Sequence, residues 1–329
     1  RDSSTSRGLG DVYKRQRLDE NGEIRSYKFV KSVICSRVKG VYKEINALLE
    51  PEEGADLTDL QTKYAAVLDQ LPTMDELYRK RLVLRKARGG MEIESNEAKL
   101  VMDENGRCID IVKRDRGTSE CMIEEFMLLA NQCAANAGRT NKVPFVYRVH
   151  DKPDPDKLER FSNFILKFGY YFKPDAKGKE ISREINRLLK EIKGKSEENV
   201  ISTLAIRSMA KAYYSTDNIG HYGLAFPYYT HFTSPIRRYP DMMVHRLLAR
   251  YLAGGKSPDV AFYNEQCEHS SDMEVVAAEA ERASVKYKMV EFMEDKIGQE
   301  FDGVISGVTE WGVYVELDDT HIELSLIHI

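Results

Sequence analysis

The run His231–Arg246, HFTSPIRRYPDMMVHR, carries the most distinctive chemistry of this chain. Two adjacent arginines, Arg237 and Arg238, follow a Thr-Ser-Pro segment and precede apolar residues at roughly helical spacing. Pro235 fixes its own φ and disfavours helix at Ser234, so the chain enters a helix from an extended segment. Guanidinium groups there would lie near free backbone N–H groups at the positive helix end, which suits phosphate binding. An ordinary solvated helix start fits the same pattern.

An aromatic stretch leads into the two arginines: Tyr222, Tyr228, Tyr229, His231 and Phe232. Aromatic side chains beside basic ones suit single-stranded nucleic acid, because base stacking contributes about 1–3 kcal/mol per base. Aromatic residues in an extended segment also serve as plain core residues. The stretch therefore indicates either a stacking surface or a packed interior.

Composition restricts the class of protein. The chain has 329 residues, 42% hydrophobic and 31% charged, which is typical of a soluble globular protein. A net charge of −4 means that any basic surface must be local. The five cysteines show no metal-ligand spacing, and no apolar run approaches the roughly 20 residues that cross a bilayer. We expect a reduced, cytoplasmic protein without a membrane segment.

The coarse pattern predicts an α+β fold. Helical spacing of apolar residues predicts helices over residues 41–49, 57–71, 74–86, 119–137, 156–168, 181–192, 200–214, 237–252, 259–269 and 272–296. Hairpins are expected over residues 18–34 and 91–112, around Asn-Gly turns, and a buried strand over 143–149. Pro72 is expected to separate two helices, and Gly138 to end one.

Further motifs lie upstream and downstream of the arginines, in the order RGG at 88–90, MIEEFMLLAN at 122–131, YRVHDKP at 147–153, LAIRSMAKAYYSTDNIGHYGLA at 204–225 and AER at 280–282. Together with the arginine run they resemble, in order and spacing, the RNB family of 3′-to-5′ exoribonucleases, the family of ribonucleases R and II. The resemblance covers roughly residues 18–295 and looks greatest to bacterial ribonuclease R.

The resemblance implies a domain organisation. Residues 17–296 would be the C-terminal portion of an RNB catalytic domain. The Gly-punctuated strand sequence of residues 297–324 resembles the start of an S1-type RNA-binding domain, a five-stranded OB-fold barrel that would be truncated here. Residues 1–16 and 325–329 match neither pattern and are expected to be non-native tails, or else natural disordered ends.

The resemblance also assigns candidate catalytic residues. Arg237 matches the arginine at the scissile phosphate, where it would stabilise charge that develops during attack. Arg238 would contact the RNA backbone or act as a structural partner. Glu281 matches a glutamate near the active site, although a helix-surface carboxylate is the plain alternative.

The candidate RNA-binding residues are Tyr42, His150, Lys152, His231, Thr233, Ser234, Arg238, Trp311 and Tyr314. Tyr42 matches a tyrosine near the 3′ end of bound RNA, and a half-buried core tyrosine is its alternative. His150 would contact RNA or support its loop; a general base is less consistent with a family that cleaves with metal-activated water. Trp311 and Tyr314 would lie on opposite strand faces, one of them exposed.

The resemblance implies Mg²⁺ as cofactor, held by aspartates of a Gly-Asp…Asp-x-Asp-Asp type segment. In the family that segment precedes the first hairpin. Nothing between Arg1 and Val30 matches it. Asp11 follows a glycine, as in the motif, but the rest of the motif is missing around it. We therefore expect no complete metal site in this chain.

The leading hypothesis is a fragment of a processive hydrolytic exoribonuclease that releases nucleoside 5′-monophosphates. The fragment would bind single-stranded RNA but be inactive alone, with no obligatory protein partner. Two alternatives are a non-catalytic RNB-like RNA-binding protein and an interaction subunit that has lost RNA binding.

Overall fold

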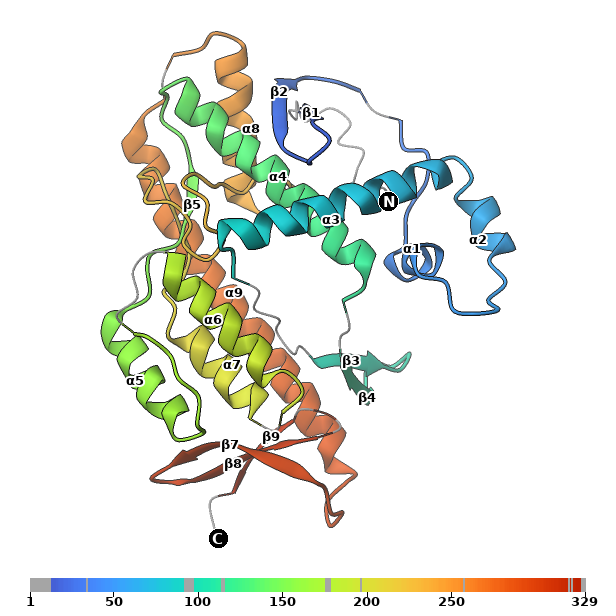
Figure 1. Ribbon diagram of the computed structural model, residues 1–329, viewed down its shortest axis with the longest axis vertical. Helices are drawn as coiled ribbons and strands as arrows, with labels where there is room; N and C mark the ends of the chain where they lie inside the picture. The colour runs from blue at the N-terminus through green and yellow to red at the C-terminus, as the bar shows by residue number, and fades with distance from the viewer. Residues whose placement is uncertain are drawn as a thin grey trace. The chain divides into compact units, whose positions relative to one another are not determined.

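The computed structural model describes residues 13–33, 35–91, 98–113, 116–174, 179–195, 197–256, 258–318, 320 and 322–326. The chain divides into two compact units. Unit 1 comprises residues 1–90, 116–151 and 211–271, and unit 2 comprises residues 91–115, 152–210 and 272–329. Both contain helices and short antiparallel strands (Figure 1), which confirms the α+β class.

Unit 1 is built mainly from helices. Its elements are β1 Tyr13–Leu18, β2 Ile24–Val30, α1 Tyr42–Leu49, α2 Thr58–Lys63, the 3-10 helix η1 Leu68–Gln70, α3 Leu71–Arg88, α4 Thr118–Thr140, β5 Tyr147–Val149, β6 Tyr213–Ser215, α8 Tyr239–Leu252 and the first part of α9 Val260–Glu294. Strands β1 and β2 form the expected hairpin, and β5 pairs antiparallel with β6. The hairpin pairs Tyr13 with Val30, so β1 begins inside the segment expected to be a tail.

The core of unit 1 forms around α4. The apolar residues Cys133, Ala134, Ala135 and Ala137 of that helix share one buried cluster with residues of β5 and α8. Small side chains on α4 allow close packing, and the cluster includes the aromatic rings of Phe29, Phe145 and Phe232. The helix therefore positions both β5 and the chain that leads into α8.

Unit 2 contains β3 Ala98–Met102, β4 Cys108–Lys113, α5 Pro155–Leu166, α6 Lys179–Ile192, α7 Glu198–Arg207, the rest of α9, β7 Gly303–Thr309, β8 Gly312–Leu317 and β9 Glu323–Leu326. Strands β3 and β4 form the second expected hairpin, and β7, β8 and β9 form an antiparallel sheet in that order. A cluster that includes Cys108, Ile111, Leu317 and Ile322 packs against the last part of α9.

Several predicted boundaries were wrong. The helix expected over 57–71 is broken, because α2 ends at Lys63 and α3 begins at Leu71, with Pro72 in its first turn. Proline is tolerated there, since the first N–H groups of a helix have no partner within it. The helix expected over 200–214 ends at Arg207, and its last residues form β6. The two helices expected over 259–296 are one continuous helix, α9.

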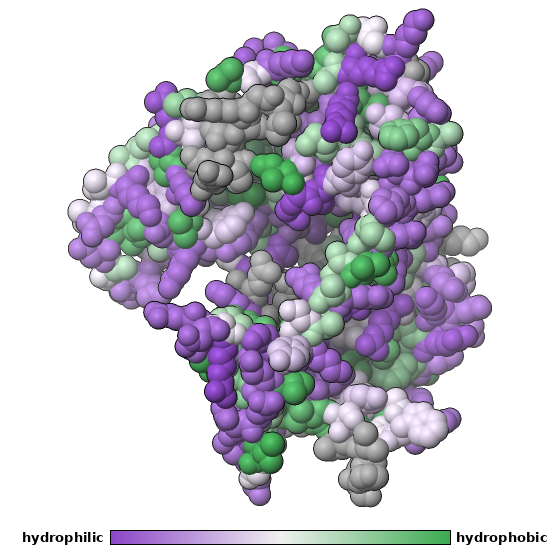
Figure 2. Space-filling view, turned by 180° about the vertical axis from the view of Figure 1, so that it is seen from behind, coloured by the Kyte–Doolittle hydropathy of each residue, from purple (hydrophilic) through white to green (hydrophobic). Residues whose placement is uncertain are grey.

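Surface composition agrees with the high content of charged residues. Figure 2 shows one face of the molecule on which hydrophilic side chains predominate and hydrophobic ones are scattered. Among the described residues, no helix combines the length and the apolar character that a membrane span requires.

Gly138 does not end its helix as expected. Helix α4 continues to Thr140, and a Cβ placed on Gly138 would lie 2.6 Å from Cγ of Phe145. The glycine is therefore a point of close packing between α4 and the segment before β5.

We expect Gly138→Ala to lower the midpoint of thermal unfolding by about 2–4 °C or more. Alanine is the better helix former by about 1 kcal/mol, but a Cβ only 2.6 Å from a buried ring requires overpacking that costs about 2–3 kcal/mol, so the net effect is destabilising. Gly40→Ala is the control, because the nearest atom to its new Cβ is 4.0 Å away. A Gly138→Ala midpoint equal to or above that of the parent would contradict this account.

Candidate nucleic-acid interface

The two arginines lie in a turn that precedes α8. The backbone N–H groups of Arg237 and Arg238 both donate to the carbonyl oxygen of Ser234, at 3.3 and 3.0 Å. Arg238 is the extended N-cap residue, and α8 begins at Tyr239 rather than at Arg237 as expected. We call residues Ser234–Arg238 the arginine turn. The chain turns just before α8, so the two arginines project from a loop rather than from the face of a helix.

The two arginines have different environments. A carboxylate oxygen of Asp241, which is fully buried, accepts hydrogen bonds from Arg238 Nη2 at 2.9 Å and from the Ser234 N–H at 2.7 Å. A buried carboxylate needs such partners, because an unpaired charge in the interior is costly. Arg238 is therefore engaged within the protein, whereas the side chain of Arg237 is exposed. The arrangement favours the structural interpretation of Arg238.

The chain that enters the arginine turn is held by side chains from two helices. Asn131 of α4 accepts a hydrogen bond from the Phe232 N–H at 2.9 Å. On α8, His245 lies with Nε2 2.8 Å from the Phe232 carbonyl oxygen, and its ring stacks on that of Phe232 at 4.3 Å. Phe232 itself is buried. Both backbone polar groups of this residue are thus hydrogen-bonded outside any helix or sheet.

Part of the aromatic stretch is core, and so is Phe226, which lies between its members in the sequence. Phe226, Tyr229 and Phe232 are buried, and Tyr229 stacks on Phe226 with a centroid distance of 5.7 Å. Tyr228 is half-buried under the guanidinium of Arg139, 4.8 Å from the ring centroid. The packed-interior alternative therefore holds for these three buried rings.

His231 is a neutral imidazole in this environment. Its Nδ1 lies 2.8 Å from the hydroxyl oxygen of Tyr214. Burial lowers the pKa of His231 to about 2, with further lowering by the charges of Arg238, Arg148 and Arg237. Burial and the neighbouring His150 likewise lower the pKa of His221 to about 3. Neither ring carries charge at neutral pH, so His231 can offer a hydrogen bond but no positive charge to a ligand.

We expect the free energy of unfolding to fall as the pH falls from about 6.5 to about 4.5. In that window the unfolded histidines bind protons that His231 and His221 do not bind when folded, which costs about 1.4 kcal/mol per pH unit for each. His231→Asn keeps an acceptor near the Tyr214 hydroxyl and removes one titrating group. Urea unfolding at pH 7, 6 and 5 should show a smaller pH slope for this variant; an unchanged slope would contradict the assignment.

Other predicted site residues of unit 1 lie outside the arginine turn. His150 is buried, and its Nδ1 accepts from the Gly223 N–H at 2.9 Å, so it supports the loop that crosses it. Its ring lies 5.1 Å from that of His221. Tyr42 begins α1 and is 49% exposed. Thr233 and Ser234 are half-buried within or beside the turn.

The remaining predicted residues belong to unit 2. Lys152 and Glu281 are exposed, the latter on α9. Trp311 is 81% exposed in the turn between β7 and β8, and Tyr314 is half-buried on β8. The tryptophan is thus a turn residue rather than a strand residue as expected.

Sequence reasoning missed the residues that hold the turn. Asn131, Asp241, His245 and Tyr214 all lie within or beside quoted motifs, but none was singled out. A signal existed for Asn131, which is a polar residue on the apolar face of a strongly patterned helix. Asp241, four residues after Arg237, also had the spacing of a first-turn carboxylate.

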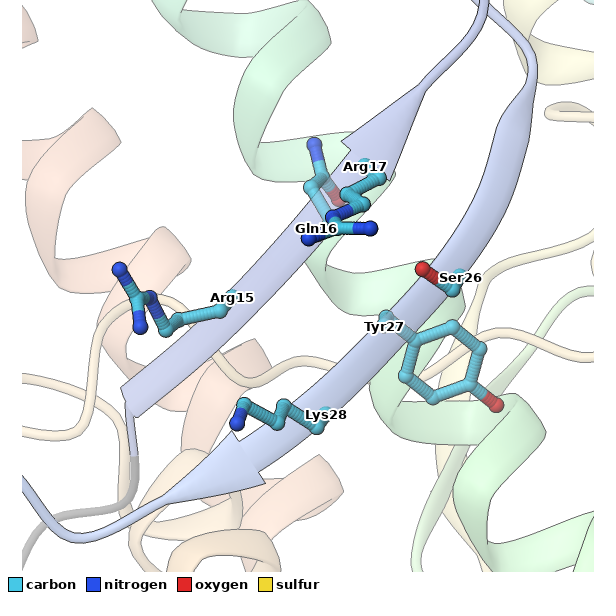
Figure 3. Close-up of a pocket in the computed structure, with 6 residues that line it drawn as sticks. All are labelled: Arg15, Gln16, Arg17, Ser26, Tyr27 and Lys28. Atoms are coloured by element: carbon cyan, nitrogen blue, oxygen red, sulfur yellow. The ribbon is translucent and has the colours of Figure 1, made fainter.

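A separate pocket of 490 Å³ lies against the hairpin of β1 and β2, lined by Arg15, Gln16, Arg17, Ser26, Tyr27 and Lys28 (Figure 3). The strand register places Arg15 opposite Lys28. None of these residues was predicted as a site residue, and two of them belong to the expected tail 1–16.

The residues around the arginine turn do not fit Mg²⁺. That ion prefers several oxygen ligands, usually carboxylates and water. Here one carboxylate, Asp241, already accepts from Ser234 and Arg238, and its neighbours are imidazoles and guanidinium groups. In the described part of the chain, no group of three or more His, Cys, Asp or Glu side chains could hold a metal ion. Asp11 lies outside the described residues.

Comparison with protein families gives one match. The model of the RNB domain matches residues 15–254, which include the arginine turn and the segments that hold it.

Curated relatives cover nearly the whole chain. Ribonuclease R 1 of Lactococcus lactis is 39% identical over 318 residues, which are 95% of this chain and 38% of the relative. Ribonuclease R of Thermotoga maritima is 37% identical over 95% of this chain and 44% of its own length. The chain therefore spans less than half of each.

Solved structures have the same fold. Ribonuclease R of Mycoplasma genitalium, in complex with ribose-methylated single-stranded RNA, superposes with a TM-score of 0.84 and 26% identity. The match covers 95% of this chain and 49% of that one. The yeast pseudonuclease Ssd1 superposes with a TM-score of 0.69 at 21% identity, which shows a shared fold alone.

Proposed function

Because this chain belongs to the RNB-domain family of ribonucleases, we propose that it binds single-stranded RNA as part of a 3′-to-5′ exoribonuclease. The whole protein would hydrolyse RNA processively to nucleoside 5′-monophosphates, with Mg²⁺ as cofactor. One observation supports a role for this chain above the others. Arg237 is exposed on a turn that is hydrogen-bonded to the buried carboxylate of Asp241, which also engages its neighbour Arg238.

The role proposed for Arg237 follows from its chemistry. A guanidinium group offers planar, forked N–H donors that match phosphate oxygens. Donors that are already in place stabilise developing negative charge without reorganisation when the reaction occurs. An exposed arginine on a fixed turn meets that requirement better than one on a mobile loop. Mg²⁺, when bound in the whole enzyme, would supply the activated water.

Other residues would extend the RNA-binding surface in each unit. In unit 1, the exposed ring of Tyr42 is available for stacking on a base. In unit 2, we propose that residues 297–324 begin an S1-type domain, for which the antiparallel β7–β9 sheet and the exposed ring of Trp311 give support. Glu281 is proposed as a site residue on its family match and its exposure on α9.

We expect Arg237→Ala to weaken binding of a single-stranded oligoribonucleotide by about tenfold or more, since hydrogen bonds to charged groups contribute about 1.5–3 kcal/mol. The dependence of log K on log salt concentration should fall by about 0.7, which corresponds to one lost phosphate contact. Fluorescence anisotropy over a salt series measures both. Arg250→Ala, an exposed arginine in the last turn of α8, is the charge-matched control. Equal affinities and slopes for parent and Arg237→Ala would refute the proposal.

We expect the polypeptide of residues 1–329 to bind uniformly labelled single-stranded RNA without cleaving it in the presence of Mg²⁺. Arg237 can stabilise charge, but a guanidinium group cannot act as a base at neutral pH. Thin-layer analysis of the products should show no nucleoside monophosphate, with an active ribonuclease R as positive control. Release of mononucleotides that depends on Mg²⁺ and on Arg237 would show that this polypeptide is active.

A further inference from the structure

We propose that Asn131 is a positioning residue that determines how the arginine turn presents Arg237 to an RNA phosphate. This inference rests on the proposed function, since it assumes that Arg237 contacts RNA. Asn131 lies on α4, far from Arg237 in the sequence, and is 3% exposed. It would not contact RNA itself, and its effect would pass through the chain that enters the turn.

The amide group of Asn131 joins two parts of one segment. Its Nδ2 donates to the Tyr229 hydroxyl at 2.9 Å, and its Oδ1 accepts from the Phe232 N–H at 2.9 Å. One short side chain therefore fixes the phenol end of Tyr229 and the backbone of Phe232 at the same time. Asparagine suits this task because its side chain carries a donor and an acceptor on one planar group.

Packing around Asn131 holds Tyr229 where its hydroxyl reaches the amide group. Leu128, one turn before Asn131 on α4, shares a buried cluster with Tyr229 and Phe226. The ring of Tyr229 is thus packed along α4, with its hydroxyl at the amide group. Burial, which dominates, raises the pKa of that hydroxyl to about 12, so it stays protonated. The phenol therefore remains a neutral hydrogen-bonding partner over the working pH range.

The fixed point is close to the functional side chain. Phe232 is hydrogen-bonded to Asn131 through its N–H and to His245 through its carbonyl, and Ser234 is hydrogen-bonded to Asp241 through its N–H. Three side chains thus fix the path of the backbone just before Arg237. Asp241 and His245 both belong to α8, whereas Asn131 alone among these three ties the path to α4.

Removal of the amide would leave the Phe232 N–H buried without a partner. A buried N–H without a partner is unfavourable, so the segment would move to reach another acceptor or water. The guanidinium group of Arg237 would then occupy a wider range of positions. The affinity for RNA would fall because part of the binding free energy would be spent on ordering the turn.

A double-mutant cycle tests the coupling between Asn131 and Arg237, with RNA affinity and its salt slope as readouts. We expect Asn131→Ala to weaken binding by about fivefold and to lower the salt slope towards that of Arg237→Ala. In the Arg237→Ala background the same substitution should have almost no further effect. A purely structural residue would lower the midpoint of thermal unfolding but leave the salt slope unchanged and the effects additive.

The matched control is Asn141→Ala at the end of α4. Its Nδ2 donates to the Ala137 carbonyl at 2.8 Å, within the helix that it caps. This variant should leave both RNA affinity and salt slope unchanged. Each variant is assayed about 10 °C or more below its own unfolding midpoint, so that the native state dominates.

The outcomes separate the two proposals. If Arg237→Ala weakens binding but Asn131→Ala is silent or additive, the positioning role is refuted and the proposed function stands. If Arg237→Ala has no effect, the proposed function fails and this inference fails with it. Should Asn131→Ala not fold, Asn131→Ser replaces it in the cycle, because its hydroxyl can hold a water in the gap but is too short for both partners. The same coupling is then required.

Discussion

Buried backbone groups outside helices and sheets must find hydrogen-bond partners, and the proposed site depends on how this chain meets that requirement. The segment between β6 and α8 crosses the core of unit 1 with little regular structure. Side chains of Asn131, His245 and Asp241 supply the partners for Phe232 and Ser234. These hydrogen bonds fix the path of the loop at Phe232 and Ser234.

The need to pair buried polar groups also determines the environments of the charged side chains near the arginine turn. Asp241 is fully buried and accepts a hydrogen bond from Arg238, so the second arginine is engaged within the protein. The positive charges near His231, together with its burial, keep that ring neutral. Arg237 is left as the exposed cation of the turn. A phosphate that approaches this turn would meet the exposed guanidinium group of Arg237 on a hydrogen-bonded backbone.

Aromatic residues illustrate how one sequence pattern serves two purposes. The stretch that leads into the arginines could have been a stacking surface for bases, but Phe226, Tyr229 and Phe232 are packed in the interior. Their rings give the hydrogen-bonded loop its van der Waals support, as the stacking of Phe232 on His245 shows. Tyr42 and Trp311 are among the aromatic residues that are exposed. The base stacking proposed for this chain would therefore involve other aromatic residues than those that pack its core.

The sequence by itself indicated the family, through the resemblance of its ordered motifs. It also predicted the α+β class and most helices and hairpins, because apolar periodicity and Asn-Gly turns are local signals. Its errors arose where a local signal had a tertiary use. A helix end was expected at Gly138, but this glycine allows close contact between α4 and Phe145. A break between helices was expected at Pro72, but this proline lies in the first turn of α3. Only the tertiary structure decided which arginine is exposed and which side chains hold it. Arg237 and Arg238 are identical in type and adjacent. The carboxylate of Asp241, three residues after Arg238, accepts a hydrogen bond from Arg238, and the tertiary structure buries that carboxylate and brings the amide of Asn131 from α4 to the chain before the turn.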